Sequence, residues 1–472
     1  MLARRVRVIV GVLAAVACVA GPPPGARAQD SPASWLEAYR DPVSRLVGTA
    51  LTDRAAWTRL AELTDTFGHR LSGSPGLEQA IAWAVEGMKR DGLETVRAEP
   101  VAVPHWVRGH ESLELLDPVP RPLVMLGLGG SVGTPADGIT ASVLVVSSFD
   151  DLDARASDVP GRIVLYNVPF TDYGRTVQYR SRGASRAARL GAVAALVRSV
   201  GPTGLRTPHT GGFSYEPDVA RIPAAAISVE DAEQLQRMQD RRASTRVRLR
   251  MDAHTLPDAE SANVVGEIAG RERPDEIVVL GCHFDSWDVG TGAIDDGGGC
   301  IAAWEAVRLM KATGLRPRRT VRAVLFTNEE NGLRGGLAYR DRHRAALPNH
   351  VLMLEADLGF FPPLAFGFTG NDRARAAVTQ IASMLRGIDA GRVGQSGGGA
   401  DIGPSVQAAS IPSMSFNGDA QTYFMYHHTP ADTIDRIDPM DLSRAVAAMS
   451  VMAYVVADLP QRLGEDGTGG AR

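Results

Sequence analysis

Short apolar runs alternate with longer amphipathic segments over residues 261–460. The runs predict buried strands, and the longer segments carry apolar residues at helical spacing. Strand-like runs span 276–280, 320–326 and 351–354, and helix-like segments span 297–313, 335–345 and 374–385. This alternation predicts an α/β fold with a mainly parallel sheet covered by helices.

The N-terminal part of the chain is mostly helical by the same criterion. Apolar residues recur at helical spacing within 30–66. Ser74 is a suitable N-cap and Pro75 a suitable first residue for a helix over 75–90. Strands are predicted next, over 96–103 and 112–116.

The pattern changes between residues 120 and 255. Short strands over 142–146, 162–166 and 193–197 are separated by Gly/Pro turns and one helix over 184–190. We interpret this stretch as a small α/β or β-rich domain inserted into a larger one. The predicted order is an export signal at 1–28, the larger domain in two parts at 29–120 and 256–463, the insert at 121–255, and a disordered Gly-rich tail at 464–472.

The first 28 residues have the pattern of a signal peptide. Three arginines precede an apolar run over 8–20, which is too short to span a bilayer, and Ala26-Arg27-Ala28 is a small-x-small cleavage site. We therefore expect cleavage after Ala28 and a secreted or periplasmic protein. A lipid anchor at Cys18 is not favoured, because the residues before it form a weak lipobox.

Composition narrows the function classes. Hydrophobic residues make up 44% and charged residues 22%, which excludes a disordered or fibrous protein. The net charge is −4, and loss of four arginines with the signal makes it −8. No basic stripe emerges, so nucleic-acid binding is not expected. Of the two mature cysteines, Cys282 and Cys300, export permits a disulfide, but two separate buried thiols are the favoured interpretation.

Five polar clusters follow the predicted strands of the second part or lie in its loops. Each has an ordinary explanation alone, such as a surface pair, a helix cap or a solvated turn. The clusters are His283 with Asp285, Asp295 with Asp296 and three glycines, Glu329 with Glu330, Glu355 with Asp357, and His427-His428 with Asp432. Ligand sites in open α/β sheets form at the carboxyl ends of strands. Together the clusters supply imidazoles and carboxylates suited to a pair of divalent ions, with zinc preferred.

In this order, the motifs resemble those of the co-catalytic zinc exopeptidases of the aminopeptidase type. Longer segments are also similar, at 70–74, 175–180, 207–211 and 283–290, and the insert resembles a protease-associated domain. The resemblance covers nearly all of the mature chain. It implies a three-layer αβα catalytic domain with a mixed, mainly parallel sheet, in which 29–120 and 256–463 are the two catalytic parts.

The resemblance also implies a role for each site residue. Two zinc ions are expected. His283 and Asp357 are implied as ligands of the first, Glu330 and His428 of the second, and Asp295 of both. Asp285 is implied to orient His283, and Glu329 to act as general base for a hydroxide that bridges the metals. A cis peptide bond is implied between Asp295 and Asp296. Further candidates are His427 as the alternative ligand, Asp432 as a supporting residue, and Tyr423 or Tyr426 as a hydrogen-bond donor, although packed aromatics are preferred for both tyrosines.

The implied function is an exported exopeptidase that hydrolyses short peptides, above all dipeptides with free termini. An aminopeptidase that trims longer peptides is the alternative. A non-catalytic, receptor-like binding protein is disfavoured, because all five ligands and the base are present. A homodimer is implied, and stable membrane insertion is not expected.

Overall fold

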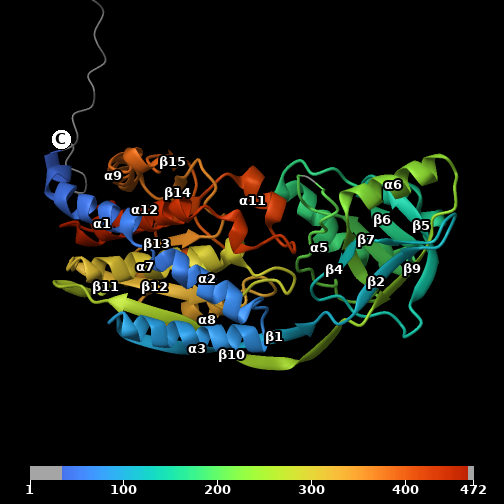
Figure 1. Cartoon of the computed structure of the whole chain (residues 1–472), viewed down its shortest axis with the longest axis horizontal. Coiled ribbons are helices and arrows are strands. Elements are labelled where there is room, and N and C mark those ends of the chain that lie inside the picture. Colours follow the sequence, from blue (N-terminus) through green and yellow to red (C-terminus); the bar gives the residue numbers. More distant parts are fainter. Residues whose placement is uncertain (1–33, 203, 466–472) are drawn as a thin grey trace, which may run out of the picture.

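The computed structural model describes residues 34–202 and 204–465. The predicted signal segment, Cys18 and residues 466–472 of the tail lie outside this range. Two units, each built on one sheet, lie side by side along the long axis of the molecule (Figure 1).

The larger unit is built on a mixed eight-stranded sheet. Its strands lie in the order β1 (Glu94–Val107), β10 (His254–Ile268), β12 (Arg319–Phe326), β11 (Arg273–His283), β13 (His350–Ala356), β16 (Ser413–Asn417), β14 (Ala365–Thr369) and β15 (Val393–Gly394). The four strands from β12 to β16 run parallel, and β10 and β14 are antiparallel to their inner neighbours. The carboxyl ends of β11, β12 and β13 therefore meet at one edge.

Helices cover both faces of this sheet. Neighbouring strand residues point to opposite faces, so Val278 and Leu280 enter one apolar core while Ile277 and Val279 enter the other. The first face carries α1 (Arg40–Thr52), α2 (Ala55–Phe67), α3 (Pro75–Arg90), α7 (Gly298–Ala312), α9 (Asp372–Ser383) and α12 (Pro439–Asp458). The second carries α8 (Arg334–Arg342) and α10 (Gly403–Ala409). This is the predicted three-layer α/β arrangement.

The predicted elements of this unit are present. Each predicted strand lies within or overlaps an observed strand, and α3 begins at Pro75 with the Ser74 hydroxyl accepting a hydrogen bond from the Leu77 amide. One helix of the described chain, α12, is long and apolar enough to cross a membrane by length and composition, and 78% of its most apolar window is buried in the protein. We assign α12 as a core helix.

The smaller unit has its own eight-stranded sheet. Its strands lie in the order β3 (Arg121–Leu123), β2 (Glu111–Leu115), β9 (Arg246–Met251), β5 (Ile139–Val146), β6 (Ile163–Tyr166), β7 (Ala194–Arg198), β8 (Ala224–Ile227) and β4 (Met125–Gly127). Helices α4 (Phe149–Ala154) and α5 (Tyr173–Arg189) pack on one face of this sheet and α6 (Val229–Asp240) on the other.

Helix α5 is much longer than the predicted segment 184–190. It begins at Tyr173, where the Asp172 side chain accepts a hydrogen bond from the Arg175 amide. Its first turns contain Gly174 and several polar residues, because one side faces a cavity between the two units. An apolar periodicity cannot be recognised where the inner face itself is polar.

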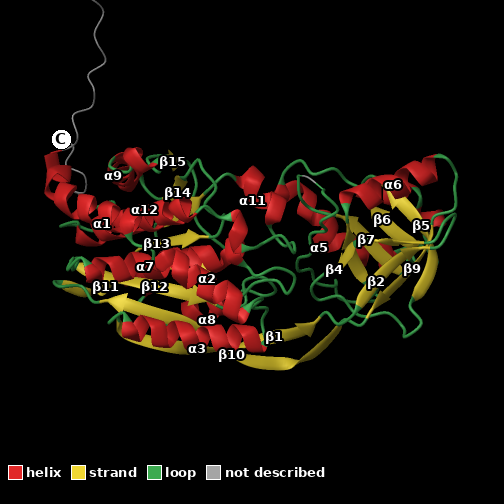
Figure 2. Ribbon diagram, in the orientation of Figure 1, coloured by secondary structure: helices red, strands yellow, loops and turns green. Residues whose placement is uncertain are grey.

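The two units are joined by a ribbon and by buried contacts. Strands β1 and β10 pair along their length and extend from the larger unit toward the smaller one (Figure 2). Trp106 and Trp287 pack edge to face, with ring centroids 6.5 Å apart. The Arg108 guanidinium binds the Asp288 carboxylate through two hydrogen bonds and also donates to the Gly127 carbonyl of the insert. The insert therefore packs directly against loops that follow β11.

Candidate active site

Five side chains from distant parts of the chain meet at the carboxyl edge of the main sheet. They are the predicted metal ligands His283, Asp295, Glu330, Asp357 and His428. Polar contacts of 2.9–3.3 Å join them in the order Asp357, His283, Asp295, His428 and Glu330. Two ligands of one tetrahedral zinc ion lie roughly 3.4 Å apart, so this spacing suits metal ligation.

His283 is the last residue of β11, and its imidazole is fixed from behind. Its Nδ1 lies 3.0 Å from the backbone carbonyl oxygen of Asp285, so Nδ1 carries the proton and the lone pair of Nε2 is free to bind a metal ion. Nε2 lies 3.1 Å from Asp295 Oδ1 and 3.3 Å from Asp357 Oδ1. The backbone of Asp285 makes the orienting contact, because its carboxylate is farther away, at 3.9 Å from Nδ1.

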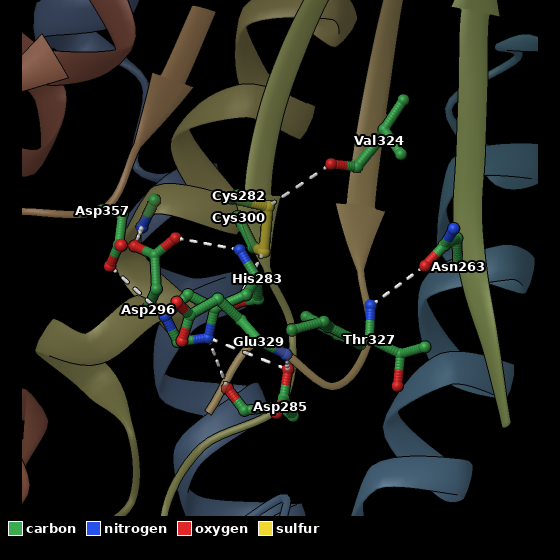
Figure 3. Close-up of a disulfide and its surroundings, with 12 residues drawn as sticks. Asn263, Cys282, His283, Asp285, Asp296, Cys300, Val324, Thr327, Glu329 and Asp357 are labelled. Carbon is green, nitrogen blue, oxygen red and sulfur yellow. Dashed lines mark hydrogen bonds and ion pairs between the residues drawn. A yellow bond between two sulfur atoms is a disulfide. The ribbon is translucent and has the colours of Figure 1, made fainter. Parts of the chain in front are cut away.

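Asp295 lies between the two imidazoles. Its Oδ1 faces His283, and its Oδ2 lies 3.3 Å from His428 Nε2. The peptide bond to Asp296 is cis, as the resemblance implies. The Asp296 carboxylate accepts hydrogen bonds from the amides of His283 and Gly299 and so joins the strand end to the start of α7 (Figure 3).

Asp432 supports the same segment from the far side. Its carboxylate oxygens accept hydrogen bonds from two consecutive amides, Ile294 at 2.7 Å and Asp295 at 3.3 Å. Arg70 is fully buried beside it and donates to the carbonyls of Phe284, Thr291 and Gly292, among others. Two buried charged side chains thus determine where the backbone of Asp295 lies.

The two adjacent histidines have different surroundings. His428 Nε2 lies 2.9 Å from Glu330 Oε2, whereas the carboxylate nearest to His427 among the described residues is that of Asp295, at 3.7 Å. The rings stack with centroids 3.5 Å apart. The Nδ1 of His428 lies 3.3 Å from the carbonyl oxygen of Thr210, a residue of the insert. The contacts favour His428 as the ligand, with His427 beside it in the cavity wall.

Glu329 and Glu330 follow β12 in a turn held by Asp285. The Asp285 carboxylate accepts hydrogen bonds from the Glu329 amide at 3.0 Å and the Glu330 amide at 3.2 Å. This contact fixes both glutamates relative to His283. Glu329 is partly buried and lines the cavity. Burial, reinforced by the charges of Asp357 and Asp285, raises the pKa of its carboxyl group to about 8.

The cluster carries more negative charge than the protein itself compensates. Burial raises the pKa of Glu330 well above its usual range, and the charge of Asp295 adds to this effect. Burial raises the pKa of Asp357 as well. Asp295 Oδ2 and Glu330 Oε1 are buried without a hydrogen-bond partner. Such a cluster is stable only when protonated or beside cations, so the donor set fits divalent metal ions.

The cluster opens into a cavity of about 1080 Å³ between the two units. The larger unit contributes Glu329, Asp357 and His427, together with Tyr423 and Phe424 of α11 (Ala420–Tyr426). The opposite wall comes from the insert and includes Tyr173, Arg180, Phe213 and Tyr215. Of the two tyrosines considered from sequence, Tyr423 lines this cavity together with Asp295, whereas Tyr426 packs against Phe361.

Cys282 and Cys300 form a disulfide, so the prediction of two separate thiols is wrong. Both residues are fully buried. Cys282 lies next to the end of β11 and Cys300 in the first turn of α7, and the Asp296 carboxylate joins these two ends through the His283 and Gly299 amides (Figure 3). The bond therefore joins the segment of His283 to the segment of Asp295.

Removal of this disulfide is expected to lower the free energy of unfolding by about 3 kcal/mol, because the bond closes a loop of 18 residues. Denaturant unfolding of a Cys282→Ala/Cys300→Ala variant measures the loss. Wild-type protein treated with a reductant should unfold at the same denaturant concentration as the variant. Equal stability of the variant and untreated wild type would contradict the expectation.

Several supporting residues are not recognisable from pattern alone. Arg70, Arg180 and Thr210 lie in segments that stand out only through the resemblance, and nothing in their local sequence marks a buried polar contact. Their partners are backbone carbonyls and a histidine more than 200 residues away in the chain. Such contacts depend on how the insert packs against the larger unit.

The chain is similar to known proteins over nearly its whole length. A model of peptidase family M28 matches residues 263–453, and a PA domain model matches 121–235. Carboxypeptidase Q of Homo sapiens is 46% identical over 408 residues, which cover 86% of each chain. Carboxypeptidase Q of Xenopus laevis is 45% identical and covers 91% of this chain and 92% of its own. The chain belongs to peptidase family M28.

Solved structures agree with membership of family M28. A peptidase M28 precursor from Shewanella amazonensis has a TM-score of 0.87 at 35% identity, covering 91% of this chain and 99% of its own. A zinc aminopeptidase from Bacillus subtilis shares the fold, with a TM-score of 0.64 at 21% identity, covering 86% of this chain and 98% of its own. The predicted fold class is confirmed, and the chain is a metallo-exopeptidase with an inserted PA domain.

Proposed function

We propose that this M28 peptidase is an exported, two-zinc enzyme that hydrolyses short peptides, above all dipeptides with free ends. The observation that carries the proposal is the continuous set of contacts through His283, Asp295 and His428. Each carboxylate oxygen of Asp295 faces a different imidazole, as expected of a ligand shared by two ions. His283 and Asp357 complete one candidate site, and Glu330 and His428 the other.

The donor set supports zinc as the metal. Each candidate site as assigned combines one imidazole nitrogen with carboxylate oxygens, and mixed N/O ligation suits zinc. When bound, two zinc ions supply Lewis-acid activation of water and of the scissile carbonyl. The unpaired oxygens of Asp295 and Glu330 are the atoms we assign to these ions.

Glu329 is our candidate for the general base. Glu329 lines the cavity beside the five candidate ligands. Among the described residues, its carboxylate makes none of the contacts of 3.3 Å or less that join these ligands. The Glu329 side chain takes a proton from the attacking water and gives it to the leaving amine. Asp285 keeps the base in place through the Glu329 amide.

The cavity supports a preference for short substrates. Its volume of about 1080 Å³ lies just above the usual range for small-molecule sites, roughly 300–1,000 Å³. The insert forms its far wall, at Tyr173 and Phe213, so an extended peptide meets this wall. Trimming of longer peptides by an aminopeptidase remains the second candidate, favoured by the open side of the same cavity.

Three substrates separate these candidates: a free dipeptide, the same dipeptide with an acetylated amino group, and a pentapeptide with the same first two residues. We expect kcat/KM to be highest for the free dipeptide, and a chelator should abolish hydrolysis. A pentapeptide cleaved as well as the dipeptide would instead support the aminopeptidase. Release of amino acids after chelation would indicate a contaminating peptidase.

Export agrees with the disulfide, because such bonds persist in oxidising compartments. We therefore propose a secreted or periplasmic enzyme, cleaved after Ala28 and without a lipid anchor. We also propose that the enzyme is a homodimer whose binding partners are short peptides. We propose that it binds no nucleic acid and is not stably inserted into a membrane.

A further inference from the structure

The insert brings one side chain with an unused hydrogen-bond donor into the active-site cavity. Tyr173 is the first residue of α5, and its hydroxyl oxygen lies 2.7 Å from Nη2 of Arg180, two turns farther along the helix. Nη1 of the same guanidinium donates to the Thr210 carbonyl at 3.1 Å and lies 3.3 Å from Nδ1 of His428. A single buried arginine thus joins the tyrosine to the surroundings of a candidate metal ligand.

The chemistry of this contact fixes the direction of the tyrosine proton. A guanidinium group has donors and no acceptor, so the Tyr173 oxygen must accept from Arg180. Its own O–H is then free to donate, and it is paired with no acceptor among the residues that the structure describes. Burial raises the pKa of Tyr173, so the hydroxyl keeps its proton at neutral pH.

Aromatic contacts hold Tyr173 on the cavity wall. Its ring stacks on Phe424 of α11, with centroids 4.7 Å apart and planes inclined by 13°. It meets His427 edge to face at 5.2 Å. Asp295 and Glu329 line the same cavity. In Figure 1, α5 lies on the side of the insert that faces α11.

We propose that Tyr173 is a substrate-contacting residue that donates its hydroxyl proton in a hydrogen bond to an oxygen of the bound peptide. Arg180 is its positioning residue, because it directs the hydroxyl and anchors it to the His428 side of the site. This inference rests on the proposed peptidase function. If Tyr173 contacts the peptide, the insert forms part of the substrate-binding surface in addition to forming the far wall of the cavity.

Tyr173→Phe tests the proposal, because it removes the hydroxyl and keeps the ring that stacks on Phe424. We expect kcat/KM for a free dipeptide to fall by 10-fold or more, as for loss of a donor to a reacting or bound oxygen. Zinc content by mass spectrometry should equal that of wild type. Tyr179→Phe is the matched control on the same helix, since that ring packs against Phe149 and Tyr166. It should retain wild-type kinetics.

A double-mutant cycle tests the role of Arg180. Arg180→Gln should lower kcat/KM. The double variant should lose much less kcat/KM than the product of the two single fold-losses. A purely structural role would give independent losses. Arg186→Gln is the control, because Arg186 pairs with Asp153 at the surface of the same helix.

The outcomes separate this inference from the proposed function. A wild-type enzyme inactive on every dipeptide would overturn the function itself. An active wild type with Tyr173→Phe within twofold of it would overturn only the role of Tyr173. A Tyr173→Phe variant that loses zinc would show that the tyrosine supports the metal site, which also contradicts substrate contact as its role.

Discussion

Replacement of Glu329 by glutamine is expected to lower kcat by roughly 10²- to 10⁴-fold, the usual contribution of a general base. Glutamine has nearly the same shape but cannot accept the proton of the attacking water. Glu329 lies outside the set of side chains joined by the closest ligand contacts, so zinc content should remain at the wild-type value. Steady-state kinetics on a free dipeptide, with metal analysis of the same sample, measures both quantities.

Two glutamates serve as controls for this substitution. Glu216 lines the same cavity but pairs with Arg189 on the insert, so Glu216→Gln should leave kcat near the wild-type value. Glu330 contacts His428 at 2.9 Å, and Glu330→Gln should lose zinc as well as activity. If Glu329→Gln kept more than a tenth of the wild-type kcat, another group would have to be the base.

The catalytic unit could be predicted closely because its sequence signals are local. Strands β11, β12 and β13 each contain a short apolar run with acids or histidine at the strand end or within the next four residues, and Ser74 with Pro75 marks the start of a helix. Polar residues at the ends of parallel strands meet at one edge of the sheet. The grouping of His283, Glu330 and Asp357 follows from this rule, although their roles came from the resemblance.

Contacts that depend on a turn of the chain, or on how the two units pack together, could not be predicted in this way. The pairing of Cys282 with Cys300 depends on a turn in which β11 and α7 return to one point, and spacing alone permits two free thiols equally well. The Thr210 carbonyl reaches His428 only because the insert packs against the loop that carries the histidine. Backbone acceptors leave no trace in the side-chain pattern, so sequence analysis cannot reveal them.

Removal of the metal is expected to abolish activity and to make stability depend on pH in an unusual direction. Without cations, the pKa of Glu329 is about 8 and those of Glu355 and Asp432 are about 7, all raised first by burial. The same groups titrate near 4 in the unfolded chain. Between about pH 6.5, above which the histidines of the unfolded chain are mostly neutral, and about pH 8, these groups therefore bind more protons in the folded apoprotein than in the unfolded chain. Its stability should rise as the pH falls through this range.

Thermal melting of the chelated protein at pH 8.5, 7.5 and 6.5 measures this effect, with the zinc-loaded protein as control. The apoprotein should melt at progressively higher temperature toward pH 6.5. Bound cations offset the repulsion among the carboxylates, so the loaded protein should change less, and the gap between the two should be widest at pH 8.5. Zinc added back after chelation should restore both activity and melting temperature. An apoprotein that melts at the same or a lower temperature toward pH 6.5 would mean that these carboxylates are not crowded together. That result would contradict the proposed metal site.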